Sequence, residues 1–183
     1  MNRRQCLHTL SALTVGTLLL PRWATASASP LLLLPERSLL FYHLHTGEKQ
    51  RVTYWAEGQY LPDSLANINH LLRDFRNNKT SAIDTTLLDQ LTLLQTRLNV
   101  PCEFHIISAY RSPETNSMLQ SRSNGVAKHS MHLEGRAIDI RIPKVPLALV
   151  RQQALAMKMG GVGYYPSSDF VHVDSGSIRQ WGS

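Results

Sequence analysis

The chain has 183 residues, of which 43% are hydrophobic and 17% charged, and this composition excludes a collagen, a coiled coil and a wholly disordered protein. Its length suits one compact domain with a leader or a tail. The formal net charge is +6, but three of the 19 basic residues and none of the 13 acidic ones lie among the first 26 residues, so the rest of the chain carries only +3 and no nucleic-acid partner is expected.

Residues 1–26 are typical of an export signal. The adjacent Arg3 and Arg4 precede an apolar stretch over residues 10–20, and Ala24-Thr25-Ala26 offers a small-residue cleavage site. The apolar stretch is too short for a membrane-spanning helix. The two arginines favour the twin-arginine route, with an ordinary secretory leader as the alternative. We therefore expect a periplasmic protein with no membrane span after cleavage.

Residues 27–36 are expected to form a linker, and residues 37–183 a single domain. The chain has two cysteines, Cys6 and Cys102, and Cys6 is removed with the leader. No disulfide framework can then form despite the oxidising compartment. The stability of the domain must come from packing and from any bound metal.

The first half of this domain predicts a β-hairpin followed by two helices. β-Branched and aromatic residues flank the turn His45-Thr46-Gly47-Glu48, and apolar residues then recur at helical spacing twice, with Asp84 as the N-cap of the second helix. The expected strands cover residues 39–44 and 49–55, and the expected helices residues 62–78 and 84–98.

The second half mixes strands and helices without a regular alternation. An apolar strand leads to Ser112 and Pro113, which begin a short helix, and a polar loop then leads to a strand that alternates strictly. Strands are expected over residues 103–110, 136–142 and 170–174, and a last helix runs from Pro146 to Gly160-Gly161. This order predicts an α+β fold with a largely antiparallel sheet and helices packed on it.

Three polar side chains in this half form a candidate metal site. His132 lies in the polar loop, Asp139 on the polar face of the alternating strand, and His172 on the last strand. Two imidazoles and one carboxylate suit Zn²⁺ and leave a fourth position for water. The spacing alone leaves a second interpretation open, in which His132 caps a loop and His172 is an ordinary sheet residue.

The pattern Ser130-x-His132-x₆-Asp139, followed by His172, resembles the zinc D-Ala-D-Ala-type metallopeptidases, and especially their exported murein-endopeptidase branch. The resemblance extends to further motifs over nearly the whole of the chain after the leader. These motifs lie at residues 43–47, 107–112, 160–166 and 170–174. The resemblance implies that His132, Asp139 and His172 are zinc ligands in a zinc peptidase fold.

The resemblance also implies catalytic residues. Arg111 matches a Tyr-Arg-Ser motif, where its guanidinium would polarise the scissile carbonyl, stabilise the oxyanion or bind a substrate carboxylate. Related carboxypeptidases place the general base three residues before the last zinc histidine, where this chain has Asp169. Asp174, two residues after His172, is the competing base or a carboxylate that orients a zinc ligand.

The function implied is that of a zinc-dependent murein endopeptidase that hydrolyses peptide cross-links of peptidoglycan. Bonds between two meso-diaminopimelate residues are favoured as the substrate, and bonds between diaminopimelate and D-Ala come second. Two alternatives remain open. One is a zinc carboxypeptidase or dipeptidase that acts on cell-wall peptides, and the other is a non-catalytic peptidoglycan-binding module. The sequence predicts no oligomeric state.

Overall fold

The computed structural model describes residues 31, 34–122 and 126–182. The expected export signal at residues 1–26 and most of the expected linker lie outside these described residues. Within them, no helix is both long enough and apolar enough to cross a membrane. Cys102 is buried and forms no disulfide with any residue of the described chain.

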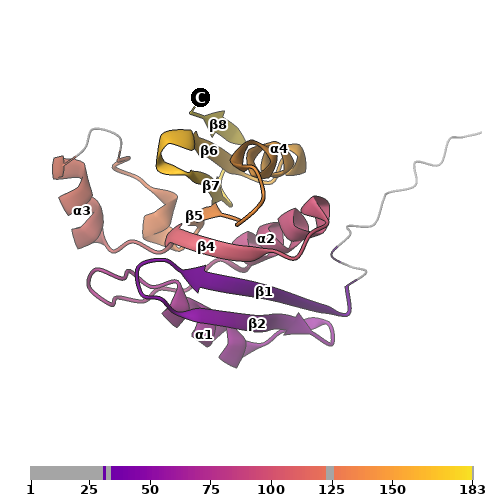
Figure 1. Cartoon of the computed structure of the whole chain (residues 1–183). Helices are drawn as coiled ribbons and strands as arrows, with labels where there is room; N and C mark the ends of the chain where they lie inside the picture. Colours follow the sequence, from indigo (N-terminus) through magenta and orange to yellow (C-terminus); the bar gives the residue numbers. More distant parts are fainter. Residues whose placement is uncertain (1–30, 32–33, 123–125, 183) are drawn as a thin grey trace, which may run out of the picture.

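The fold is α+β and is built on one eight-stranded sheet, with the strand order β3-β2-β1-β4-β5-β7-β6-β8 (Figure 1). The strands are β1 (Glu36–His43), β2 (Lys49–Ala56), β3 (Gln59–Tyr60), β4 (Glu103–Ser108), β5 (Ala137–Arg141), β6 (Gly161–Tyr165), β7 (Phe170–Asp174) and β8 (Arg179–Trp181). The pairs β1–β4 and β6–β8 are parallel, and the other pairs are antiparallel. The prediction of a largely antiparallel sheet is confirmed.

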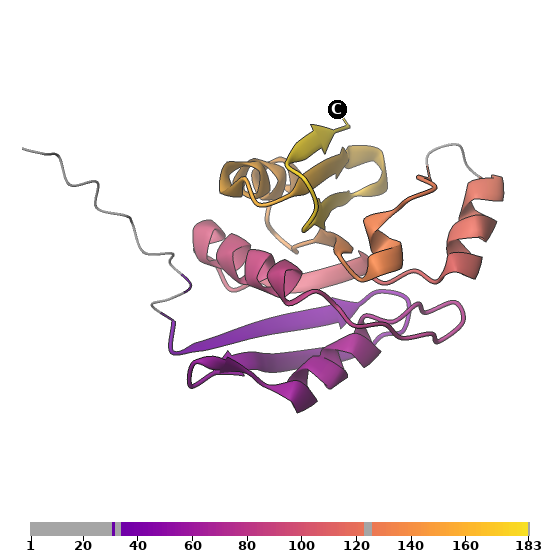
Figure 2. The same cartoon turned by 180° about the vertical axis from the view of Figure 1, so that it is seen from behind.

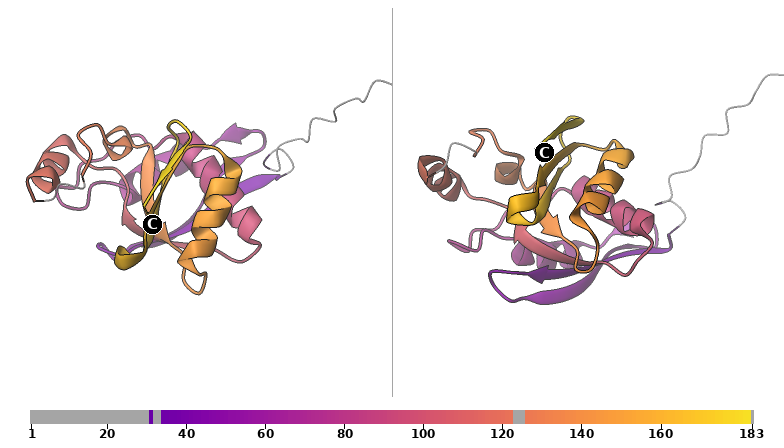
Figure 3. Two further views of the ribbon diagram at one scale, coloured as in Figure 1. Left: turned by 90° about the horizontal axis from the view of Figure 1, so that it is seen from above. Right: turned by 45° about the horizontal axis from the view of Figure 1, so that its top comes forward.

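The core lies between the sheet and the helices α1 (Pro62–Leu71), α2 (Thr85–Leu98) and α4 (Leu147–Met157). Alternate strand residues such as Phe41, Ile106, Ile138 and Val171 are buried in this layer, because successive side chains of a strand point to opposite faces. The helix α3 (Pro113–Arg122) stands away from the other helices. Figures 2 and 3 show it on the side of the sheet opposite α4.

Several local predictions are confirmed. The hairpin of β1 and β2 forms around the expected turn. Asp84 caps α2, since its Oδ1 accepts a hydrogen bond from the Thr86 backbone N–H at 2.9 Å. Ser112 Oγ likewise accepts from the Thr115 N–H at 3.2 Å at the beginning of α3.

Two helix ends differ from the prediction. The first helix ends at Leu71 instead of Asn77-Asn78, because the buried Asp74 carboxylate accepts the backbone N–H groups of Arg76 and Ser112 and so holds a compact turn. The last helix is capped by Lys158 in the left-handed conformation and not by Gly160-Gly161. Gly160 instead passes so close to the backbone of Asp174 that a Cβ atom would overlap its carbonyl oxygen.

The strands β3, β6 and β8 were not expected from the sequence. β6 is rich in glycine, and β3 and β8 are very short, so none of them shows a clear alternation. β6 pairs with β7, and β8 is held at the sheet edge by its pairing with β6, which is a tertiary effect. These two strands are important for the site, because they extend the sheet beyond β7.

Candidate metal centre and substrate cleft

The sheet and one short helix bring the three predicted metal ligands together. Asp139 in β5 lies directly opposite His172 in β7, so the two side chains share the sheet face that points away from the helix-covered core. His132 lies on the 3₁₀ helix Met131–Glu134, whose N-cap is Ser130. Gly135 ends this helix at φ 65°, a conformation suited to glycine, and returns the chain to β5.

The ligand atoms of the three residues lie within 4.8 Å of one another, and all three side chains are buried. His132 Nε2 is 3.2 Å from His172 Nδ1 and 3.3 Å from Asp139 Oδ2. His172 Nδ1 is 2.8 Å from Asp139 Oδ1. Two nitrogens and one carboxylate therefore converge on one point.

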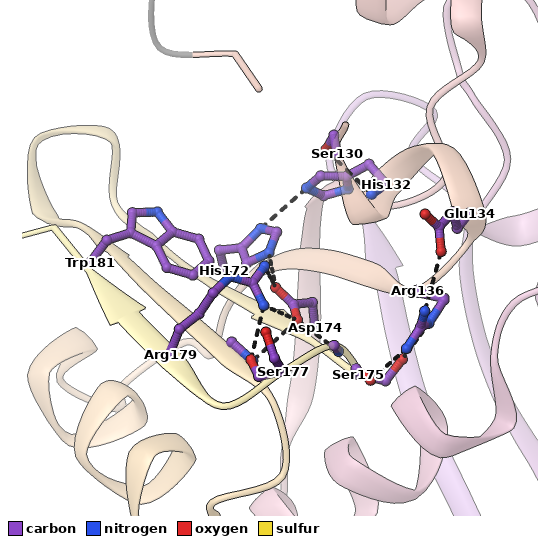
Figure 4. A network of polar contacts seen from close by, with 12 residues as sticks. Ser130, His132, Glu134, Arg136, His172, Asp174, Ser175, Ser177, Arg179 and Trp181 are labelled. Carbon is purple, nitrogen blue, oxygen red and sulfur yellow. Dashed lines mark hydrogen bonds and ion pairs between the residues drawn. The ribbon is translucent and has the colours of Figure 1, made fainter. Parts of the chain in front are cut away.

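Each imidazole has an outer nitrogen, which points away from this place, and an inner nitrogen, which points toward it. The hydrogen-bond partner of the outer nitrogen determines which of the two carries the proton. His132 Nδ1 lies 2.6 Å from the carbonyl oxygen of Ala109, which can only accept, so this nitrogen carries the proton. His172 Nε2 lies 3.0 Å from Asp174 Oδ2 and donates in the same way (Figure 4). In neutral imidazoles with these tautomers, both inner nitrogens present lone pairs beside the Asp139 carboxylate. This donor set fits a divalent cation such as Zn²⁺.

Burial and charge shift the titration of these groups. Burial lowers the pKa of His132. Burial also tends to lower the pKa of His172, but hydrogen bonds to Asp139 and Asp174, together with their negative charges, outweigh it and raise the pKa to about 9. With these partners alone, His172 carries a proton on its inner nitrogen, where a divalent cation would replace it.

Asp174 lies behind His172 and does not line the cavity described below. It is fully buried, and both of its oxygens are engaged (Figure 4). Oδ1 accepts from the backbone N–H groups of Gly161 at 3.1 Å and Gly176 at 2.8 Å, and Oδ2 accepts from Arg179 Nη2 at 2.6 Å as well as from His172. Burial tends to raise the pKa of Asp174, but these hydrogen bonds hold it well below its ordinary value. Asp174 thus orients an imidazole.

The structure does not bring Asp169 to this centre. Asp169 follows the 3₁₀ helix Pro166–Ser168 in the left-handed conformation, and its side chain is 62% exposed. Its carboxylate pairs with Arg141 Nη1 at 2.7 Å, and it is not among the residues that line the cavity, although its neighbours Ser168 and Phe170 are.

Arg111 does reach the centre. Its backbone N–H donates to the His132 carbonyl oxygen at 3.0 Å, and its Nη1 donates to Asn116 Oδ1 at 3.2 Å. Its buried Nε has no hydrogen-bond partner among the described residues. Burial lowers the pKa of the guanidinium, and the negative charge of Asp139 opposes this effect. Arg111 therefore presents a positive charge beside the metal centre.

These groups open into a cavity of about 550 Å³. Its lining includes His132, Asp139, His172 and Arg111, together with described residues of the loop that precedes His132. The lining also includes Trp181, which sequence reasoning did not identify. The aromatic lining residues are Tyr165, Phe170 and Trp181. Trp181 and the nearby Arg179 belong to β8, and their positions depend on strand pairing that no local pattern reveals.

The sequence of residues 34–181 matches the family described as peptidoglycan L,D-endopeptidase MepK. The curated peptidoglycan L,D-endopeptidase MepK of Escherichia coli strain K12 is 43% identical over 181 residues, which cover 98% of this chain and 97% of the relative. The protein of the same name from Shigella flexneri shows the same identity and coverage. A probable peptidoglycan L,D-endopeptidase MepK of Haemophilus influenzae is 38% identical over 182 residues, or 98% of this chain and 95% of that relative.

Proposed function

The chain belongs to the family of peptidoglycan L,D-endopeptidases described as MepK, and from this membership we propose that it is a zinc-dependent endopeptidase that hydrolyses peptide cross-links of peptidoglycan. The observation that supports the zinc dependence most directly is the convergence of two imidazole nitrogens and one carboxylate in the lining of a cavity. His132, Asp139 and His172 would hold the ion. When bound, Zn²⁺ supplies a Lewis acid that polarises a peptide carbonyl and lowers the pKa of water.

The residues around the ligands keep them in a state ready for the ion. The Ala109 carbonyl oxygen holds a proton on His132 Nδ1, and Asp174 holds a proton on His172 Nε2. Each hydrogen bond fixes the orientation of a ring and directs its inner nitrogen toward the place of the ion. Arg179 pairs with Asp174 at 2.6 Å and balances its buried charge.

We assign Arg111 the role of stabilising negative charge on the substrate. Its guanidinium lines the cavity beside Asp139, and its Nε has no partner within the described chain. A fixed positive donor at this place stabilises an oxyanion at the scissile carbonyl, or a carboxylate of the substrate, without reorganisation.

We assign Asp174 the role of orienting the His172 imidazole. We do not assign it the role of a base that removes a proton from water. Both of its oxygens are occupied by donors, and it is fully buried behind the imidazole. Asp169 would have to leave Arg141 before it could act as a base. We therefore assign no proton transfer to Asp169 in this conformation.

The bond that we favour joins two meso-diaminopimelate residues. The names of the relatives specify an L,D-endopeptidase. A bond between two meso-diaminopimelate residues joins the carbonyl of an L-centre to the amine of a D-centre, whereas a bond from D-Ala to diaminopimelate joins two D-centres. The same proposal places the enzyme in the periplasm, reached through the twin-arginine signal expected at residues 1–26, because peptidoglycan lies in that compartment.

Digestion of purified sacculi tests this function. Zinc-loaded protein is incubated with sacculi and the muropeptides are identified by mass spectrometry. We expect dimers joined through two diaminopimelate residues to disappear and monomers to accumulate. A chelator should stop the reaction, added zinc should restore it, and Asp139→Asn should prevent both zinc binding and cleavage.

Three results would contradict the proposal. Removal of terminal residues without loss of dimers would identify a carboxypeptidase or dipeptidase. Binding to sacculi without any product would identify a non-catalytic module. Cleavage that persists at full rate in the zinc-free Asp139→Asn protein would remove the role of the metal.

A further inference from the structure

The C-terminal strand β8 places an aromatic side chain directly against the metal centre. The ring of Trp181 lies 5.1 Å from the ring of His172, measured between centroids, at an angle of 53° (Figure 4). Trp181 is half-buried and lines the cavity. Its indole is therefore available to a bound molecule while it touches a ligand of the proposed metal ion.

Two glycines in β6 provide the space that this strand needs. A Cβ atom at Gly163 would lie 2.6 Å from Cε2 of the Trp181 indole, and one at Gly161 would lie 2.7 Å from Nη1 of Arg179. Both distances are far too short for non-bonded atoms. Gly163 is paired with His172 in the sheet, so the indole occupies the volume that any other side chain would fill beside this histidine.

The indole is held in one orientation by neighbours on two sides. Its Nε1–H donates to the hydroxyl oxygen of Tyr165 at 2.7 Å, and the Tyr165 ring stacks on Phe170 with centroids 4.5 Å apart. The guanidinium of Arg179 lies 5.0 Å from the centroid of the indole while it pairs with Asp174. The polar edge of the ring is thus satisfied, and the ring is a pre-organised apolar surface.

The cavity lining therefore combines two kinds of chemistry. Arg111 supplies positive charge, and the aromatic wall, defined as Tyr165, Phe170 and Trp181, supplies apolar surface. We propose that Trp181 is a specificity-determining residue that binds the methylene chain of the diamino acid whose carbonyl is cleaved. This inference rests on the proposed endopeptidase function and identifies which part of the substrate the wall contacts.

Kinetics on a soluble cross-linked muropeptide dimer test the proposal with the zinc-loaded full chain. Trp181→Ala should raise KM by roughly tenfold, since it removes most of an aromatic contact surface, with a much smaller change in kcat. Trp181→Phe should recover most of the affinity. Gly163→Ala keeps the tryptophan at position 181 but pushes its ring out of its present position, so this variant should resemble Trp181→Ala. Trp55→Phe, a change far from the cavity on β2, is the matched control and should leave KM unchanged.

A shortened substrate isolates the contact itself. A dimer analogue with alanine in place of the donor diamino acid should bind more weakly to the wild-type protein, but this penalty should almost vanish in Trp181→Ala. Zinc content and thermal unfolding are measured for every variant. An equal penalty in both proteins, or a rise in KM explained by lost zinc, would overturn the proposal.

Binding without turnover separates this inference from the proposed function. The monomeric tripeptide product should change the tryptophan fluorescence of the wild-type protein and not that of Trp181→Phe. If the wild-type protein cleaves no dimer but shows this fluorescence change, the proposed function is wrong and the binding role of Trp181 is supported. If the wild-type protein and Trp181→Ala cleave dimers with the same KM, the binding role of Trp181 is wrong and the proposed function is supported.

Discussion

The backbone N–H of Arg111 donates a 3.0 Å hydrogen bond to the carbonyl oxygen of His132, while His132 Nδ1 donates to the Ala109 carbonyl oxygen at 2.6 Å. These two bonds join the segment after β4 to the short helix that carries the imidazole. The proposed metal ligand and the proposed oxyanion donor are thus held by one backbone unit. Asn116 completes it, since its amide accepts from Arg111 and donates to the Ala127 carbonyl oxygen at 3.3 Å.

Replacement of Arg111 should therefore affect catalysis and not metal binding. Arg111→Lys keeps the charge but removes the planar fork, and we expect kcat/KM on cross-linked dimers to fall by about 10²–10³-fold, as for loss of an oxyanion donor. Zinc content should be unchanged. Arg122→Lys, at the exposed end of α3, should have no effect. A loss of zinc in Arg111→Lys would instead assign this residue a structural role.

The two candidate carboxylates should behave differently when each is replaced by its amide. Asp174→Asn should weaken zinc binding by roughly 10–100-fold, because the carboxylate that orients His172 is lost. Asp169→Asn should leave zinc affinity and kcat nearly unchanged, since Asp169 pairs with Arg141 at the surface. Competition with a chelator and the pH profile of kcat check both. Loss of the acidic limb of that profile in Asp169→Asn, with zinc still bound, would identify Asp169 as the base.

Gly135, in the turn after His132, should be far more sensitive to substitution than a glycine in open space. Gly135 has φ 65°, and a Cβ atom there would also overlap the backbone carbonyl of Ala82, whereas Gly47 has φ 73° and open space. Gly47→Ala should cost about 1 kcal/mol of unfolding free energy from backbone strain alone. Gly135→Ala should cost more than about 3 kcal/mol because steric overlap is added. Urea denaturation of the zinc-free proteins measures both. Equal costs at the two positions would show that the backbone at Gly135 relaxes freely.

The buried His43 should make stability depend on pH. Burial, together with the charge of His45, lowers the pKa of His43 from 6.5 in the unfolded chain to about 4. Because the unfolded state binds the proton more readily, this contribution is complete above about pH 6.5 and decreases as the pH falls toward about 4. Its full size is about 3 kcal/mol.

His43→Asn tests this dependence, since the amide oxygen can still accept the His45 backbone N–H that His43 Nδ1 accepts at 3.3 Å. The unfolding free energy of the chelator-treated variant should fall less steeply than that of the wild type between about pH 7 and about pH 4.5. His70→Asn, at a side chain that is 66% exposed, should keep the wild-type slope. Identical slopes for His43→Asn and the wild type would contradict the assignment.

Elements with local patterns could be predicted from the amino-acid sequence alone. The hairpin, the Asp84 cap and the α+β class follow from alternation, helical spacing and turn residues, each of which depends on neighbours within a few positions. The motif around His132 and Asp139 also indicated the murein-endopeptidase branch of the zinc peptidases, and the family match over residues 34–181 confirms this resemblance.

Which polar groups contact one another could be seen only in the folded chain. Asp169 and Asp174 are both within three residues of His172, yet pairing with Arg141 keeps Asp169 at the surface. Asp174 instead accepts from one backbone amide of β6 and from one in the turn after β7. Trp181 reaches the cavity because glycines in a neighbouring strand leave room for it. Such contacts depend on strand order and register between distant segments. A local sequence pattern reflects only the strand or helix in which a residue lies, so it does not predict these contacts.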